Sequence, residues 1–92
     1  MMSNIPVDLK KVSKKDINKE IARVGIIAEM DAVSLYEQLA AMTDNKALKT
    51  MLLDIAKEEK THAGEFLALL LRDDPQQKKE LEAGRKEVDE KA

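Results

Sequence analysis

Apolar residues recur every three or four positions along two long stretches of the chain, residues 14–42 and 45–72. This spacing is typical of amphipathic α-helices, and no proline interrupts either stretch. A helix over residues 14–42 would hold about 29 residues and would be about 43 Å long. Its apolar positions form two stripes, which indicates that this helix packs against more than one partner. The stripes are Ile21, Val24, Ala28, Leu35, Leu39 and Met42, and Ala22, Ile26, Val33, Tyr36 and Ala40.

Capping residues suggest where the two helices begin. Residues 1–12 contain Pro6 and no periodic pattern, so we expect a flexible N-terminal arm. Ser13 is the expected N-cap of the first helix, with Asp16 three residues later as a weak form of the capping box. Asp44 is the expected N-cap of the second helix, in the short turn between the two.

A third, weaker segment follows the second helix. The residue before a proline avoids the helical region, so the second helix should end at Arg72, ahead of Asp74 and Pro75. Asp74 and Pro75 also suit the N-cap and first position of another helix. Residues 75–92 contain only Leu81 and Val88 as large apolar residues, which predicts a short outer helix or a frayed tail.

The short turn predicts an antiparallel helical hairpin over residues 13–74. Glu29 lies 15 residues before Asp44, and Glu59 lies 15 residues after it. The two carboxylates should therefore meet at the same height, roughly 22 Å from the turn. His62 follows Glu59 by three residues and projects from the same face of its helix.

These polar residues occupy positions where the pattern predicts apolar ones. Glu59 and His62 continue an apolar series on the second helix, and Glu29 interrupts one on the first. An inward-pointing charge needs a partner or a metal ion, so the three residues are candidate metal ligands. The interrupted series are Leu48, Leu52, Ile55, Phe66 and Leu69, and Ile26, Val33 and Tyr36.

Composition supports an all-α fold and excludes several functions. The 92 residues are 43% hydrophobic and 37% charged, with one Phe, one Tyr and no Trp, which suits helices better than sheets. The absence of cysteine excludes disulfides, Fe–S clusters, cysteine-bound zinc and a rubredoxin-type electron donor. The net charge of −2, without a basic face, argues against nucleic acid as a partner. Without a signal peptide or a membrane-length apolar span, we expect a cytoplasmic protein.

The predicted hairpin is half of a ferritin-type di-iron site. Such a site takes one Glu from each of two helices and a Glu-x-x-His pair from each of two others. The chain supplies one helix of each kind, so two chains would have to dimerise into a ferritin-like four-helix bundle. The dimer would hold four carboxylates, which balance the charge of two divalent ions. Carboxylate and imidazole ligands suit iron or manganese, and zinc would also bind.

Two runs, IAEMDAVSLYEQ at residues 27–38 and LDIAKEEKTHA at residues 53–63, resemble the encapsulated ferritins. The resemblance implies a two-helix protomer with a ferroxidase site at the dimer interface, two iron ions per dimer, and a ring-like decamer of five dimers. It also implies an encapsulin shell as a partner, with the ring inside the encapsulin nanocompartment that stores the oxidised iron. On this chain the implied iron ligands are Glu29, Glu59 and His62, with Tyr36 beside the site as a further catalytic residue.

Three features depart from the family pattern. Some members flank the first ligand with glutamates that hold incoming metal, but this chain has Ala28 and Asp31 there, which leaves Asp31 as the expected extra metal-binding residue. Leu35 stands where some members have Trp. No encapsulin-targeting peptide is recognisable after Val88, so the chain is truncated, fused to the shell protein, or targeted differently.

The leading hypothesis is a ferroxidase that oxidises Fe(II) with O2. One alternative is a di-iron peroxide scavenger, although no cysteine-ligated electron donor is present. The other is a helical assembly module without catalysis, either metal-stapled or metal-free. Zn, Mn or Ca are possible substitutes for iron at the site. Tyr36 has an equally simple interpretation as a core aromatic residue. Glu58, Asp31 and Glu65 have a simpler interpretation as solvated or interface charges than as ligands.

Overall fold

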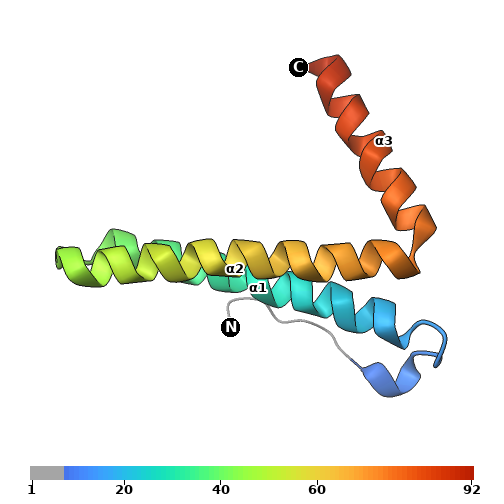
Figure 1. Cartoon of the computed structure of the whole chain (residues 1–92), viewed down its shortest axis with the longest axis horizontal. Coiled ribbons are helices and arrows are strands. Elements are labelled where there is room, and N and C mark those ends of the chain that lie inside the picture. The colour runs from blue at the N-terminus through green and yellow to red at the C-terminus, as the bar shows by residue number, and fades with distance from the viewer. Residues whose placement is uncertain (1–7) are drawn as a thin grey trace.

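The computed structural model describes residues 8–92, and all regular structure within that range is helical. Figure 1 shows two long helices side by side, running in opposite directions, with a third that leaves the end of the pair at a steep angle. The expected all-α fold with an antiparallel hairpin and a C-terminal helix is confirmed. The elements are η1 (Leu9–Lys11), α1 (Ile17–Met42), α2 (Lys46–Asp73) and α3 (Pro75–Lys91).

The start of α1 differs from the expectation. Residues 1–7 of the expected N-terminal arm lie outside the described residues, and α1 begins at Ile17 rather than at Lys14. Asp16, not Ser13, is the N-cap residue. The Ser13 hydroxyl donates a hydrogen bond to the Asp16 carboxylate at 3.1 Å, so it is engaged with a side chain rather than with the first helical turn.

The turn of the hairpin also corrects one expectation. Asn45, not Asp44, is the N-cap of α2, and its side-chain oxygen accepts a hydrogen bond from the Leu48 backbone N–H at 2.9 Å. The Thr43 hydroxyl accepts a hydrogen bond from the Asn45 N–H at 3.1 Å. Both candidates are good N-cap residues, and Asn45 takes the role because its backbone is extended and its side chain reaches the third helical N–H.

A single residue joins α2 to α3. α2 continues to Asp73, one residue past the expected end, and Asp74 then caps α3 by accepting the Gln77 N–H at 2.9 Å. Pro75 is at the first position of α3, as predicted. Arg23 of α1 also binds Asp74, with its Nη2 2.7 Å from Oδ2, so the junction is tied back to the hairpin.

The interior of the hairpin contains mostly alanines among its buried apolar residues. Its buried apolar side chains are Ala22, Val33, Ala40, Ala56 and Leu70. Alanine lets helices approach closely but buries little surface, and many large apolar side chains of the described residues stay exposed. Among them are Met30, Met42, Leu48, Met51, Leu69 and Val88. Within residues 8–92, no helix has the length and hydropathy needed to cross a membrane.

Candidate metal centre

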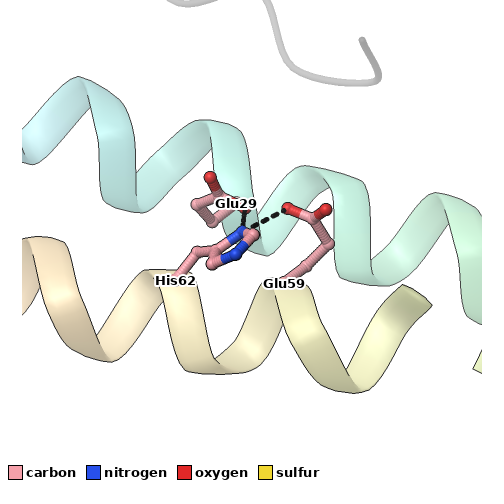
Figure 2. Close-up of side chains that lie close together, drawn as sticks. All are labelled: Glu29, Glu59 and His62. Carbon is pink, nitrogen blue, oxygen red and sulfur yellow. Dashed lines mark ion pairs between the residues drawn. The ribbon is translucent and has the colours of Figure 1, made fainter. Parts of the chain in front are cut away.

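Three ligand-type side chains converge in the gap between α1 and α2. Figure 2 shows Glu29 on the ribbon of α1 and Glu59 and His62 on that of α2, with both carboxylates directed at one imidazole nitrogen. His62 Nδ1 lies 3.5 Å from Glu29 Oε2 and 3.5 Å from Glu59 Oε2. One ligand atom from each residue falls within 4.8 Å of the others, and no other group of this kind occurs in the described range.

Helix geometry places these residues together. Glu59 and His62 are separated by three residues and so project from one face of α2. Glu29 comes from the opposite helix at the same height, as the equal distances from the turn predict. The convergence is therefore a consequence of helix register and does not depend on a flexible loop.

The local electrostatics favour a cation. Glu29 Oε2 is buried and has no hydrogen-bond partner among the described residues. A buried carboxylate oxygen without a partner is costly, and a bound cation would remove that cost. The side chains of Glu29 and Glu59 are 19% and 21% exposed, whereas His62 is 46% exposed, so the imidazole is at the open side of the group.

A simpler interpretation is an ion-pair triad. A protonated His62 would attract both carboxylates, but 3.5 Å exceeds the usual length of an N–H···O hydrogen bond, and neither contact meets hydrogen-bond geometry. Two oxygens and one nitrogen around a shared point instead match the carboxylate and imidazole set that iron, manganese and zinc accept. The residues present therefore fit a metal ion.

An open hollow of about 310 Å³ adjoins the group, and Glu65 and Phe66 form part of its wall. Sequence reasoning treated Glu65 as a solvated or interface charge and Phe66 only as one member of an apolar series. The helical spacing could have placed them here, because they follow His62 by three and four residues on the same face of α2. The hollow is lined by Glu29, His62, Glu65, Phe66 and Leu69.

The other two predicted site residues lie outside this group. Asp31 is buried in α1, with 8% of its surface exposed, and it follows Glu29 by two residues, so it projects from a different face of the helix. Tyr36 is half-buried two helical turns beyond Glu29. Asp31 does not belong to the group of converging ligand atoms.

Comparison with known proteins places the chain among ferritin-related sequences. The EncFtn-like family model matches residues 5–84. A ferritin-like–encapsulin shell fusion protein of Pyrococcus furiosus is 49% identical over 81 residues, which are 88% of this chain and 23% of that protein. An encapsulin nanocompartment cargo protein of Myxococcus xanthus is 39% identical over 69 residues, which are 72% of this chain and 53% of that protein. The chain thus spans about a quarter of the length of the Pyrococcus furiosus protein and about half of the length of the Myxococcus xanthus protein.

A solved structure has the same fold. The crystal structure of the encapsulated ferritin domain from Pyrococcus furiosus matches with a TM-score of 0.83 and 46% identity, covering 98% of this chain and 94% of that one. The likeness extends beyond the hairpin, because α3 lies within the matched region.

Proposed function

The chain belongs to the EncFtn-like family, and from that premise we propose that two copies of it form a ferroxidase that oxidises Fe(II) with O2. The resemblance predicted from the sequence is thereby confirmed, and the enzymatic activity is the proposal. The observation that carries it is the meeting of Glu29, Glu59 and His62 at one point of the hairpin.

The incompleteness of the group supports a site between two chains. One hairpin offers two carboxylates and one imidazole, which is half of the set that ferritin-like di-iron proteins use. Large apolar side chains on the same face stay about half exposed on both sides of the group, with Leu48 at 49% and Leu69 at 51%. A second copy packed on this face would bury them and add the missing ligands.

The residues of the chain have distinct tasks in this proposal. Glu29 of each copy lies between the helices, where its two oxygens could hold two Fe(II) ions together. Glu59 and His62 of each copy would bind one of the two ions. Fe(II) is here the substrate: two ions give up two electrons, which with two protons reduce one O2 to hydrogen peroxide. Tyr36 and Asp31 are proposed helpers, in electron transfer beside the site and in metal uptake respectively.

We further propose that this chain works with an encapsulin shell, as a ring-like decamer of five dimers. The names of the two relatives support the link to a shell: one is a fusion with an encapsulin shell protein and the other is an encapsulin cargo protein. A small helical assembly has no closed space for a mineral, so the oxidised iron would be stored inside the shell.

Two neighbouring glutamates of α2 allow a matched test. Glu59 approaches His62 at 3.5 Å, whereas Glu58 is exposed and belongs to no converging group. Glu59→Gln and Glu58→Gln remove the same charge at adjacent positions. We expect Glu59→Gln to slow Fe(II) oxidation about 100-fold or more and Glu58→Gln to retain the wild-type rate, measured by absorbance of Fe(III) and by O2 uptake.

The stoichiometry separates the proposal from its alternatives. A ferroxidase with the stated chemistry consumes one O2 for every two Fe(II). A peroxide scavenger would turn over faster with hydrogen peroxide and a reductant than with Fe(II) and O2. Equal oxidation rates in the two glutamine variants would contradict the assignment of Glu59.

A further inference from the structure

Gly25 and Phe66 make the closest contact between α1 and α2 that involves a glycine. A Cβ atom placed on Gly25 would lie 2.7 to 2.8 Å from three atoms of the Phe66 ring, Cδ1, Cε1 and Cγ. Real Cβ atoms essentially never approach so closely, and Cγ is near the root of the side chain, not at its flexible tip. The ring therefore rests on the backbone of α1, and only glycine leaves room for it.

This contact lies one helical turn from the metal ligands on both helices. Gly25 precedes Glu29 by four residues, and Phe66 follows His62 by four. Residues four apart share a helix face. The Gly25–Phe66 contact and the Glu29–His62 contact are therefore neighbouring contacts between the same two helices. The two contacts are one turn apart, about 5.4 Å along each helix, so a change in helix separation at Gly25–Phe66 also changes the separation at Glu29–His62.

We propose that Gly25 and Phe66 are positioning residues that set the separation of Glu29 from His62 and so tune the metal site. The proposal rests on the proposed function for the identity of the substrate, but the spacing itself comes from the contact. The Phe66 ring, seated against Gly25, acts as a spacer of fixed thickness.

The same ring separates two hollows. Phe66 and Leu69 line both the hollow beside Glu29 and His62 and a second one of about 260 Å³. The second hollow also contains the polar residues Asn18 and Asp73. Displacing the ring would therefore join this second hollow to the one beside Glu29 and His62, and additional water there weakens electrostatic interactions at the site.

Glycine-to-alanine substitutions at two positions form the test. Gly25→Ala and Gly64→Ala each add one methyl group within a helix and raise helix propensity equally. A Cβ on Gly64 meets nothing within 4 Å, so Gly64→Ala is the matched control on the helix that carries His62. The probe is Co(II) alone, whose visible absorption spectrum reports ligand geometry, followed by Fe(II) oxidation over a range of Fe(II) concentrations.

We expect Gly25→Ala to weaken Co(II) binding about tenfold or more, to change the spectrum, and to raise the Fe(II) concentration needed for half-maximal rate. Gly64→Ala should match wild type in all three. The double variant Gly25→Ala/Phe66→Leu, with a smaller side chain opposite the new methyl group, should recover part of the lost affinity. Helix content by circular dichroism should not fall in either alanine variant.

Several results would overturn the proposal. The first is a Gly25→Ala protein with the Co(II) affinity and spectrum of Gly64→Ala. If Gly25→Ala fails to fold, Phe66→Leu alone gives the answer, because unchanged Co(II) binding there would exclude a spacer role. Failure of the ferroxidase proposal looks different: wild type would then bind Co(II) but leave Fe(II) unoxidised, and the Co(II) comparison would still decide the role of Gly25.

Discussion

The hairpin and α3 are both amphipathic helical regions, but they treat their charged residues in opposite ways. In the hairpin, Glu29 and Glu59 are about four-fifths buried and meet His62 between the helices. In α3, Arg85 makes ion pairs with Glu82 and Asp89 on its own exposed face, at 2.6 and 2.7 Å. No residue of α3 is buried.

The difference makes the charges of the hairpin, and not those of α3, the candidate metal ligands. The pairs of α3 join residues three and four apart on one helix and contribute little beyond local helix stability. The hairpin group joins two helices and leaves a buried oxygen of Glu29 without a hydrogen-bond partner. A protein retains such a group at the expense of stability, which is reasonable when the group binds something.

Replacing Glu29 should have the largest effect of the changes considered, and it tests whether the buried charges of the hairpin bind metal. Glu29→Ala removes a buried carboxylate whose Oε2 has no hydrogen-bond partner, so the metal-free protein should be as stable as wild type or more stable. Fe(II) oxidation should fall by about two orders of magnitude or more, since each dimer loses two ligands. Thermal unfolding with a chelator and Fe(II) oxidation rates measure the two effects.

The control for Glu29 lies farther along the same helix. Glu37 forms an exposed ion pair with Lys60 of α2 at 3.0 Å, also across the hairpin. Glu37→Ala should leave both oxidation and stability close to wild type. A Glu29→Ala protein that is less stable without metal but oxidises Fe(II) normally would make Glu29 a structural residue.

Metal removal should change the assembly. Each hairpin holds half of the proposed ligand set, so metal should bind the dimer and not the monomer. At a free concentration of 100 times its dissociation constant, a metal ion stabilises the bound form by about 2.7 kcal/mol. Adding Fe(II), Mn(II), Zn(II) or Ca(II) should therefore raise Tm and shift the protein to larger oligomers, as measured by light scattering.

His62→Ala is the control for this linkage, because it removes the nitrogen ligand from every half-site. Its oligomeric state should respond little to metal or chelator. If the oligomeric state and Tm of the wild-type protein do not change on addition of metal or chelator, the result would argue against a site between chains.

Loss of the N-cap of α3 should have a smaller effect than loss of the metal ligands. It should lower stability and the helix content of α3 without changing the metal site. Asp74 caps α3 through Gln77 and binds Arg23, and its side chain is 11% exposed. Asp74→Ala should cost about 1–2 kcal/mol in stability and lower the helix content of α3, with Co(II) affinity unchanged. Asp74→Asn retains a good capping residue but loses the ion pair, so it should fall between alanine and wild type. Weakened Co(II) binding in Asp74→Ala would show that the two regions are coupled.

Sequence periodicity predicted the hairpin, its register and the convergence of Glu29, Glu59 and His62, because helix geometry alone fixes all three. It failed at choices between similar local partners, such as Asn45 against Asp44, where the decision depends on which side chain reaches a backbone N–H. Sequence periodicity also did not predict that Phe66 lies beside the site, because the spacing of Phe66 in its apolar series is that of any core residue. The partner of Gly25 could not be predicted, because contact across helices depends on side-chain rotation as well as register.

The smallest expected effect concerns the start of α1, where an exposed charge can be compared with the buried one of Glu29. A hydrogen bond from Ser13, followed by the interaction with Lys19, lowers the pKa of Asp16 below its ordinary value of 3.8. Because the folded-state pKa is the lower one, the Asp16 carboxylate stabilises the folded protein above pH 3.8, and this contribution is lost as pH falls through the folded-state pKa. Asp16→Asn should therefore lower Tm slightly at neutral pH, and the two curves of Tm against pH should converge well below pH 3.8. Added salt should reduce the neutral-pH difference, since the Asp16 side chain is 49% exposed to solvent. A difference that grows as pH falls would mean that Asp16 stabilises α1 in its protonated form, and the interaction with Lys19 would then contribute nothing.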